Sequence, residues 1–593
     1  MKTQIQTKTV TKNETKPYMA PLPKEVQRMT GAQVVIQCLL EQGVDTVFGY
    51  PGGAILNIYD ELYKSSDKIR HILTAHEQGA CHAADGYARS SGKVGVVMAT
   101  SGPGATNLVT GIATAYMDSV PLVAITCNVP MALLGKDSFQ EVDIAGITMP
   151  ITKHNYIVRD VAKLADIIRE AFEIARNGRP GPVLIDIPKN VTAEEVDYIL
   201  EKIDPKIIKS NAVKRSNAKI PLPTIEELDA FAEILSNAKK PFFFVGGGVT
   251  IANATEELKT LAEKLQAPVS VSLMGKTAFS CRHELNTGMI GMHGTKASNA
   301  LANKCDVFIA VGARFSDRVI SDSKKFAREA RVVHIDIDRG EINKNIPTAA
   351  SLTGNIKIIL KELADRVKMR KKDEWNLEAD ELKKHIPLMY TKKTPLHPKF
   401  VLEKINEVLG DETIITTEVG QHQMWVAQFY PFTKPRTFLT SGGLGTMGYG
   451  TGAALGAQIA CPDRRVVHIA GDGSFRMNLN ELATISHYNI PIIIIIANNG
   501  TLGMVRQWQK MFYGKRYSAT TLDRAPDFLK LAEAFGVRGF RAANEKEFSE
   551  AFSKAVSENT PCLIDCGINI DEMVFPMVPA GKPIDELLLE AES

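Results

Sequence analysis

The chain has 593 residues, of which 44% are hydrophobic and 23% charged, as in an ordinary globular protein. Its formal net charge of +3 is too small to indicate a nucleic-acid or membrane surface, and no run of about 18 apolar residues predicts a membrane span. At about 150 residues per domain, three or four domains are expected.

The eight cysteines are scattered and form no zinc-binding pattern, because Cys562 and Cys566 make only an isolated CxxxC. The N-terminal segment is rich in Thr and Lys and lacks the apolar core of a secretory signal. We therefore expect free thiols in the cytoplasm and a disordered tail over residues 1–28.

Residues 29–190 alternate helical patterns with apolar strand patterns. The predicted strands are 45–49, 69–74, 95–100, 120–126 and 183–187. Strands separated by helices predict a doubly wound parallel sheet. Residues 191–220 have no periodic strands and many charged or amide side chains, which indicates a linker.

Two further domains of the same kind follow. In the second, residues 221–370, the predicted strands are 241–245, 269–273, 307–311 and 332–337. A charged stretch at 371–397 is predicted to be a solvated helix or a linker, and residues 398–570 form the third domain. The tail, 571–593, ends in an acidic segment for which a short helix is one option. The fold class is therefore α/β, with three doubly wound parallel-sheet domains.

The most informative stretch is 465–508. An apolar run ends at Gly471-Asp472-Gly473, and after 24 residues a second apolar run ends at Asn498-Asn499. Because the carboxyl ends of parallel strands meet at one edge of a sheet, Asp472 and Asn499 are expected to lie close together. Carboxylate and amide oxygens suit Mg²⁺, and glycines let backbone N–H groups approach phosphates. The stretch predicts a Mg²⁺–diphosphate anchor, and a purely structural turn is the alternative.

Glu77 is the strongest single candidate for proton chemistry. It follows a predicted strand and precedes a helix rich in Ala and Gly, whose small side chains permit close packing against another backbone. Burial of a carboxyl group favours its protonated form, so a buried Glu77 can hold or share a proton. The alternative is a carboxylate that is favoured at a helix N-terminus by the macrodipole.

Several motifs together resemble a known family. In chain order they are YPGGA, HEQGACHAADGYAR, TSGPGATN, DSFQEVD, RPGPVLIDIPK, TSGGLGTMGYGTGAALGA, GDGSF and LGMVRQWQ. They span about residues 29–570 and are similar to the large catalytic subunit of acetohydroxyacid synthase, or acetolactate synthase, a thiamine-diphosphate-dependent enzyme. The resemblance implies a pyrimidine-binding first domain, a central FAD-type domain and a diphosphate-binding third domain.

The resemblance also implies an activity. The family decarboxylates pyruvate and condenses the two-carbon unit with pyruvate or 2-ketobutyrate. The products are 2-acetolactate and 2-aceto-2-hydroxybutyrate, in valine, leucine and isoleucine biosynthesis. The implied cofactors are thiamine diphosphate, Mg²⁺ and FAD, the last without an obvious redox task. The implied assembly is a homodimer or homotetramer, with the site between the first domain of one subunit and the third of its neighbour, and a small regulatory subunit as partner.

Carried onto this sequence, the resemblance assigns roles to individual residues. The catalytic side chains are Glu77, Gln140 and Lys189. The substrate contacts are Phe139, Met504 and Trp508. The thiamine diphosphate contacts are Glu77, Gly420, Gln421, His422, Gly445, Met447, Gly471, Asp472, Gly473, Ser474 and Asn499. The Mg²⁺ ligands are Asp472, Asn499 and the backbone carbonyl at Thr501. Taken alone, Lys189 would be a solvated lysine, and Met447 and Trp508 would be ordinary core residues.

The central domain has no GxGxxG motif, so FAD rests on the resemblance. The implied contacts are Arg179, Gly246, Gly247, Gly248, Leu273, Met274, His293, Gly312, Arg314, Arg318, Asp336 and Ile337. Ser316 and Asn355 depart from the family, which commonly has Asp at both positions. Ser138 is a further departure, near the substrate channel.

Three rival functions remain open. A catabolic, flavin-free acetolactate synthase would lack GARFSDR, GMIGMHGT and LGMVRQWQ, all of which are present. A thiamine-diphosphate decarboxylase or oxidase would give other products from pyruvate. A non-catalytic subunit with the same fold would not need Glu77, Asp472 and Asn499 intact.

Overall fold

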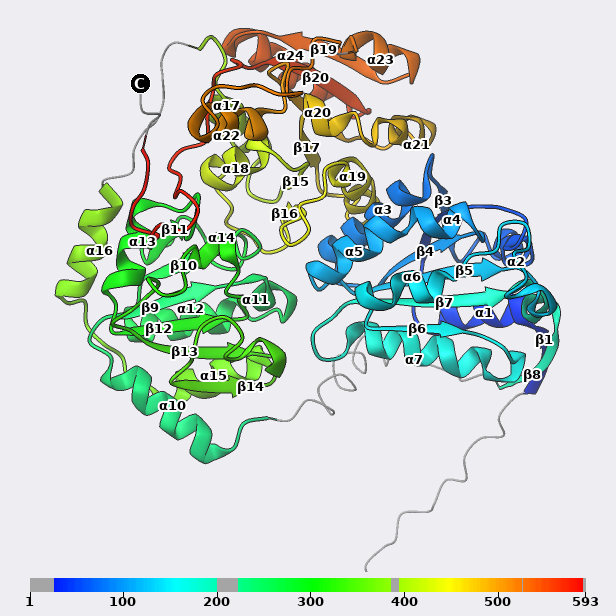
Figure 1. Ribbon diagram of the computed structural model, residues 1–593, viewed down its shortest axis with the longest axis horizontal. Helices are drawn as coiled ribbons and strands as arrows, with labels where there is room; N and C mark the ends of the chain where they lie inside the picture. Colours follow the sequence, from blue (N-terminus) through cyan, green and yellow to red (C-terminus); the bar gives the residue numbers. More distant parts are fainter. Residues whose placement is uncertain (1–25, 200–221, 385–393, 525, 590–593) are drawn as a thin grey trace, which may run out of the picture.

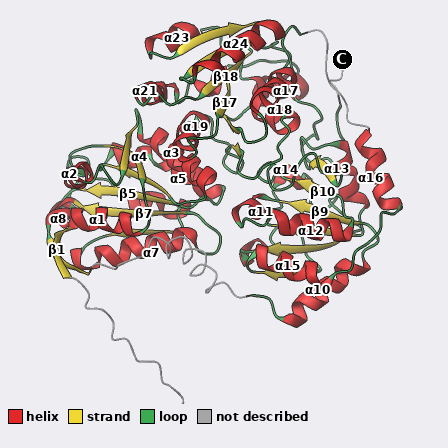
Figure 2. Ribbon diagram, turned by 180° about the vertical axis from the view of Figure 1, so that it is seen from behind, coloured by secondary structure: helices red, strands yellow, loops and turns green. Residues whose placement is uncertain are grey.

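The computed structural model describes residues 26–199, 222–384, 394–524 and 526–589. Three six-stranded parallel sheets with helices on their faces make up most of the molecule (Figures 1 and 2). This architecture confirms the predicted α/β class with three doubly wound sheets. Most of the predicted tail 1–28, most of the linker 191–220, residues 385–393 of the linker 371–397 and the last four residues lie outside the described residues.

The N-terminal sheet has the strand order β3-β2-β4-β5-β7-β6. Its strands are β2 (Thr46–Tyr50), β3 (Arg70–Leu73), β4 (Gly95–Ala99), β5 (Leu122–Asn128), β6 (His154–Ile157) and β7 (Pro182–Pro188). Its helices are α1 (Gly31–Glu41), α2 (Leu56–Lys64), α3 (Glu77–Ser91), α4 (Pro103–Asn107), α5 (Val109–Met117), α6 (Ile144–Thr148) and α7 (Leu164–Arg176).

The central sheet has the order β11-β10-β9-β12-β13-β14. Its strands are β9 (Pro241–Val245), β10 (Val269–Val271), β11 (Asn286–Met289), β12 (Val307–Val311), β13 (Arg331–Asp336) and β14 (Ala350–Thr353). The helices around it are α10 (Ile225–Asn237), α11 (Gly247–Ile251), α12 (Thr255–Leu265), α13 (Lys296–Lys304), α14 (Asp317–Ile320), α15 (Ile356–Arg366) and α16 (Glu374–Lys384).

The C-terminal sheet has the order β16-β15-β17-β18-β20-β19, which repeats the chain-order pattern of the N-terminal sheet. Its strands are β15 (Ile414–Thr417), β16 (Phe438–Leu439), β17 (Val466–Gly471), β18 (Ile493–Asn498), β19 (Arg538–Ala542) and β20 (Cys562–Gly567). Its helices are α17 (Pro398–Leu409), α18 (Gln421–Phe429), α19 (Tyr449–Ala460), α20 (Asp472–Phe475), α21 (Leu482–His487), α22 (Gly503–Phe512), α23 (Phe528–Ala534) and α24 (Glu545–Glu558).

Each sheet has a switch point, where the strands that follow the first one are added on its other side. The first strand of each unit pairs with the second on one side and with a later strand on the other. The switch points lie between β2 and β4, between β9 and β12, and between β15 and β17. Crevices at the carboxyl ends of such strands are the usual ligand sites of doubly wound folds. The loops that follow these strands are therefore where the site residues should be sought.

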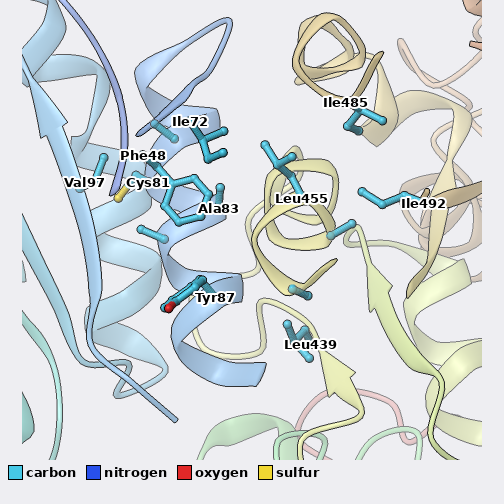
Figure 3. Packing of buried hydrophobic residues seen from close by; sticks show 14 of the residues in the cluster. Phe48, Ile72, Cys81, Ala83, Tyr87, Val97, Leu439, Leu455, Ile485 and Ile492 are labelled. Atoms are coloured by element: carbon cyan, nitrogen blue, oxygen red, sulfur yellow. The ribbon is translucent and has the colours of Figure 1, made fainter. Parts of the chain in front are cut away.

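The N-terminal and C-terminal sheets share one hydrophobic core, which is built on α3 and α19. Figure 3 shows residues of both helices and both sheets packed together, including Ala83 and Leu455. Small residues allow the close approach, since a Cβ atom on Gly86 would lie 2.2 Å from the Ala453 carbonyl oxygen. The predicted role of the Ala/Gly-rich helix in close backbone packing is thus confirmed.

Two segments differ from expectation, and a third matches one of its two predicted structures. The prediction of a strand-free linker from residue 191 is wrong for its first part, because residues 195–199 form β8, which pairs antiparallel with β1 (Val26–Thr30). The charged stretch, for which a helix or a linker was predicted, contains the helix α16. The Trp375 ring N–H of α16 donates to the Pro241 carbonyl at 2.9 Å. Residues 571–589 form no helix and are joined instead by a β-bridge between Met577 and Leu588.

Among the described residues, no helix combines the length and the apolar character needed to cross a membrane.

Candidate functional site

Asp472 stands at the carboxyl end of β17, as the first residue of α20. Its side chain is 1% exposed, and backbone N–H groups of Gly473, Asn499 and Gly500 bond to its carboxylate. Burial raises the pKa of Asp472 to about 6 in spite of these bonds. Its Oδ2 atom is buried and has no hydrogen-bond partner among the described residues. A carboxylate oxygen in this state is suited to a bound cation.

The neighbouring loop supplies an amide oxygen. Asn499 follows β18, its Oδ1 accepts the Thr501 N–H at 3.2 Å, and its Nδ2 donates to Gln421 Oε1 at 3.2 Å. The Thr501 hydroxyl donates to the Thr520 carbonyl at 2.7 Å, so the side chain of Thr501 is already engaged. Across the described residues, no cluster of three or more His, Cys, Asp or Glu forms a metal site. A carboxylate, an amide and a backbone carbonyl nevertheless fit Mg²⁺, which binds few protein oxygens.

The loop after β15 lies beside this anchor. Gly420 has φ +153° and is the N-cap residue of α18, so Gln421 and His422 are the first residues of the helix. The imidazole of His422 lies against Gly471, where an added Cβ would come within 2.8 Å of Nδ1. Burial lowers the pKa of His422 to about 3, and its Nε2 is buried without a partner. A neutral imidazole with an unsatisfied nitrogen beside a helix N-terminus fits a diphosphate oxygen. Ser474 bonds back to the Gly471 carbonyl at 3.3 Å.

A glycine-rich loop between β16 and α19 carries Gly445 and Met447. Gly445 has φ +72°, is exposed, and would place a Cβ in open space. Met447 is half-buried. The loop is fixed at its end by Glu418, whose buried carboxylate accepts the N–H groups of Gly448 at 2.5 Å and Gly450 at 3.0 Å. An exposed, rigid glycine backbone beside one large apolar side chain suits contact with a ligand.

Glu77 is the first residue of α3, and its side chain is 9% exposed. Its Oε2 accepts the Asn107 amide N–H at 2.9 Å, while Oε1 faces Gly104. The carboxylate therefore lies in the crevice at the carboxyl edge of the N-terminal sheet. Within the described residues, no hydrogen bond or ion pair joins the Glu77 side chain to Gly445, Met447 or Asp472.

The other residues of the first domain lie around the same edge. Gln140 has φ +60°, and its backbone packs against Gly102 of the turn after β4. Phe139 is 88% exposed. Lys189 is half-buried and begins α8 (Lys189–Ala193) directly after β7.

Trp508 and Met504 lie on α22, beyond the anchor. The Trp508 ring contacts Phe512 edge-on at 5.4 Å between centroids and packs against a small cluster of Met292, Phe575 and Met577. Met504 is half-buried against the core of the C-terminal sheet. No aromatic contact joins Trp508 to Phe139 in the part of the chain that the structure describes.

The central sheet offers a second crevice, between β9 and β12. Gly246, Gly247 and Gly248 follow β9, and Gly312, with φ +53°, follows β12. The Gly248 N–H donates to the Gly312 carbonyl at 3.0 Å, so the two glycine turns touch. Leu273 and Met274 lie half-buried after β10. Backbone exposed at a switch point fits a dinucleotide phosphate.

Charged residues stand around this second crevice. Asp336 ends β13 and accepts the Asp338 N–H at 2.9 Å, while Ile337 is half-buried. Arg318 is 64% exposed in its side chain, and Arg314 is half-buried. A carboxylate at a strand end and two arginines beyond the neighbouring strand fit the ribose and phosphates of a flavin dinucleotide.

Two of the residues expected at FAD have structural partners. Arg179 Nη1 bonds to Asp338 at 3.2 Å and to Glu341 at 2.9 Å, which ties the first domain to the central one. His293 Nδ1 lies 3.2 Å from the Pro576 carbonyl, and burial lowers its pKa to about 4. His293 therefore also links the central domain to the C-terminal segment.

Of the three departures from the family pattern, Asn355 and Ser138 make local hydrogen bonds and Ser316 has no structural explanation. Asn355 caps α15 by accepting the Ile358 N–H at 3.2 Å, a role that Asn and Asp perform equally well. Ser138 donates to the Leu133 carbonyl at 3.0 Å within its own loop. Nothing in the structure explains Ser316.

Comparison with known proteins agrees with this geometry. Three stretches match domains of thiamine pyrophosphate enzymes: residues 29–147 the N-terminal TPP-binding domain, 228–363 the central domain and 418–566 the C-terminal TPP-binding domain. A probable acetolactate synthase large subunit of Methanocaldococcus jannaschii is 48% identical, over 94% of this chain and 95% of that protein. Acetolactate synthases of Mycobacterium leprae and Arthrospira platensis are 46% and 45% identical, over 98% and 95% of this chain and 94% and 98% of their own lengths.

The chain belongs to the acetolactate synthase large-subunit family.

The structure also shows polar residues of this acetolactate synthase chain that the sequence analysis did not single out. Asn107 holds the Glu77 carboxylate, and Glu418 holds the backbone after Met447. Asp118 accepts the N–H groups of Gly442 at 3.1 Å and Gly443 at 2.7 Å. Gln507 bonds to Gln421. Asn107 and Gln507 fall inside the motifs TSGPGATN and LGMVRQWQ, so the resemblance could have identified them. Asp118 and Glu418 contact loops that are distant from them in the sequence, so no local pattern identifies these two residues.

Proposed function

We propose that this chain is the catalytic subunit of a thiamine-diphosphate-, Mg²⁺- and FAD-dependent acetolactate synthase. It decarboxylates pyruvate and joins the two-carbon unit to a second pyruvate or to 2-ketobutyrate, which gives 2-acetolactate or 2-aceto-2-hydroxybutyrate for branched-chain amino-acid biosynthesis. The buried Asp472 carboxylate beside Asn499, whose Oδ2 has no partner among the described residues, carries the proposal, in a chain that is 45–48% identical to acetolactate synthases along most of its length.

The third domain, residues 398–570, is proposed to hold the cofactor. Asp472 and Asn499 bind Mg²⁺ through their side-chain oxygens, together with the Thr501 carbonyl. His422, which is neutral, and the backbone around Gly420 orient the diphosphate. When bound, thiamine diphosphate supplies the nucleophilic carbon and the electron sink that decarboxylation of a 2-keto acid requires. Gly445 and Met447 hold its pyrimidine ring.

The first domain, residues 29–190, is proposed to move the proton. Glu77 Oε2 is held by Asn107, so Oε1 would be the oxygen free to hold a proton at the aminopyrimidine ring of a bound cofactor. Gln140 and Lys189, at the same sheet edge, orient the keto acid. Trp508 and Met504 face the acceptor, where an apolar wall favours the longer chain of 2-ketobutyrate by about 1–3 kcal/mol.

The central domain, residues 221–370, is proposed to bind FAD. The glycine turns after β9 and β12 approach the phosphates, and Asp336, Arg314 and Arg318 contact the polar groups. Carboligation leaves the substrate carbons without net oxidation by a flavin, so FAD has a structural role in the proposal. Arg179 joins the first and central domains next to this crevice.

The proposed assembly is a homodimer or a homotetramer in the cytoplasm, with a small regulatory subunit. Within the described residues, no hydrogen bond or ion pair joins Glu77 to Asp472, while Phe139 and Leu444 expose apolar surface near each half of the proposed site. A second copy of the chain would cover this surface and bring the halves together. The free cysteines of the described residues accord with a reducing compartment.

Product analysis with pyruvate tests the function. The purified protein, supplied with thiamine diphosphate and Mg²⁺, should release CO₂ and 2-acetolactate, and it should show the absorbance of bound flavin. Acetaldehyde or acetyl phosphate without acetolactate would indicate a decarboxylase or an oxidase. A colourless protein with full acetolactate activity would favour the flavin-free alternative, and no turnover at all would favour a non-catalytic subunit.

A further inference from the structure

A segment at the C-terminal end of the chain lies across α22 and the central domain. We call residues 571–589 the C-terminal strap. Its Val578 N–H donates to the Met292 carbonyl at 2.8 Å, and the Ile584 carbonyl accepts the Asn299 amide at 2.6 Å. Val574 and Met577 are fully buried. The strap is therefore packed against the fold over residues 574–578 and at Ile584, although it has no helix and only an isolated β-bridge.

Gln507 of α22 pairs with the backbone of this strap. Its Oε1 accepts the Val574 N–H at 2.9 Å, and its Nε2 donates to the Val574 carbonyl at 3.0 Å. The two groups of one backbone residue thus fix which end of the Gln507 amide carries the oxygen. Gln507 is 2% exposed, so water does not compete for either position.

The orientation of the Gln507 amide determines the orientation of a second amide, that of Gln421. Gln507 Oε1 also accepts Gln421 Nε2 at 3.0 Å, and the same Gln421 nitrogen donates to the Glu572 carbonyl at 2.9 Å. Both acceptors require the nitrogen of Gln421 on this side, so its oxygen must point the other way. That oxygen accepts Asn499 Nδ2 at 3.2 Å, which leaves Asn499 Oδ1 on the side of the Thr501 N–H.

We propose that Gln507 and Gln421 form a directional amide relay, through which the docked strap holds Asn499 with its oxygen toward the Mg²⁺ site. The inference rests on the proposed metal-binding role of Asn499. If the strap leaves, Gln507 and Gln421 lose the backbone groups of Val574 and Glu572 that set their direction. Asn499 then keeps only the Thr501 N–H to orient it, so its NH₂ group, which repels a cation, can turn toward Asp472. Gln507 is a positioning residue, because it acts on the metal through two other side chains.

Thermodynamic linkage makes the relay testable in both directions. If strap docking favours the metal-binding orientation of Asn499, then bound metal favours strap docking by the same factor. Changes in residues that orient metal ligands typically alter metal affinity by about 10- to 100-fold. We expect about tenfold for loss of the Gln507 amide, since Asp472 remains in place.

The test compares Gln507→Met, which keeps the shape and removes the amide, with Gln509→Met as the matched control. Gln509 lies on the same helix and bonds to the Ser518 carbonyl and the Thr520 hydroxyl, away from the strap. Calorimetric titration with Mg²⁺ at saturating thiamine diphosphate should show about tenfold weaker binding in Gln507→Met and less than a twofold change in Gln509→Met. Amide hydrogen exchange at Val574 should be faster in Gln507→Met alone.

The unmodified protein supplies the second measurement, which does not depend on how a variant folds. Addition of Mg²⁺ and thiamine diphosphate should slow exchange at Val574 about tenfold. An exchange rate at Val574 that does not change when Mg²⁺ is added would overturn the relay. Unchanged Mg²⁺ affinity in Gln507→Met would overturn it as well. Equal losses in both variants would also overturn it, by indicating general destabilisation. None of these readings depends on which product is made from pyruvate, so the relay and the proposed function can fail separately.

Discussion

Several buried histidines in this protein stay neutral far below the usual pH of histidine titration. Burial lowers the pKa of His71 and His82 to about 4 and that of His422 to about 3. In the unfolded chain these imidazoles become protonated near pH 6.5, whereas in the folded chain His82 becomes protonated only near pH 4. The unfolded state therefore holds more protons in this window. Stability that is present above pH 6.5 must be lost as the pH falls toward 4.

His82 gives a specific prediction at this scale. It is completely buried on α3, lies edge-on to the Tyr449 ring at 5.3 Å, and its Nδ1 has no partner. In His82→Gln, the unfolding free energy should depend less on pH between 5 and 6.5, by about 1.4 kcal/mol per pH unit, which is one proton. Thermal unfolding measured across this range checks it. His487→Gln, an exposed change, should leave the slope as it is, and an unchanged slope in His82→Gln would contradict a neutral buried imidazole.

At the scale of elements, a buried ion cluster joins α3 to the glycine-rich loop. Arg89 of α3 pairs with Asp85 at 2.6 Å and with Asp118 at 3.0 Å, and all three side chains are largely buried. Asp118 lies at the end of α5 and accepts the N–H groups of Gly442 and Gly443. The cluster therefore fixes the loop that carries Gly445 and Met447 to the first domain of the same chain.

Removal of Asp118 should damage both stability and cofactor binding. Asp118→Ala leaves Arg89 with one carboxylate fewer and two backbone N–H groups without an acceptor, for which a loss of about 3–5 kcal/mol is expected. The affinity for thiamine diphosphate should fall about tenfold as the loop loosens, because the ligand must then order it. Thermal unfolding and a binding titration measure the two effects. Asp197→Asn, which breaks an exposed pair with Arg28, should change neither by much.

The sequence predicted those elements and site residues whose signal is local. β9, β12, β17 and β18 are apolar runs that end at glycine or amide turns, and their doubly wound arrangement followed from the alternation with helices. β11, β16 and β19 are short or polar, so no run marks them, and their place is set by neighbouring strands. Likewise, the positions of Asp472 and Asn499 at the ends of two apolar runs could be recognised directly in the sequence.

Contacts between distant parts of the chain could not be predicted in this way. Asp118 and Gly443 are separated by 325 positions, and only the packing of the two domains brings them together. Gln507 meets Val574 because the C-terminal strap turns back over α22, whereas the sequence there suggested a tail with a short helix. Motif reasoning proposes residues for contact with a ligand, and it misses those that hold such residues in place.

At the scale of the whole molecule, the chain has two similar sheets, each with one of the residues proposed for the active site. The N-terminal and C-terminal sheets have the same strand order and share the core between α3 and α19. Glu77 and Asp472 nevertheless have separate surroundings, Asn107 and Gly104 for the first and the loop 498–500 for the second. We propose that acetolactate forms where Glu77 of one chain meets the cofactor anchored by Asp472 of another.

Mixing two inactive variants tests that claim most directly. Glu77→Gln lacks the proton-accepting carboxylate and Asp472→Ala lacks the metal ligand, so each alone should make acetolactate from pyruvate at least about 100-fold more slowly than the unmodified protein. After dissociation and reassembly of an equal mixture, half of the dimers should contain both chains, each with one intact site. About a quarter of the original activity should therefore return. A mixture no more active than its two components, under conditions where the unmodified protein reassembles and makes acetolactate, would contradict a site shared between chains.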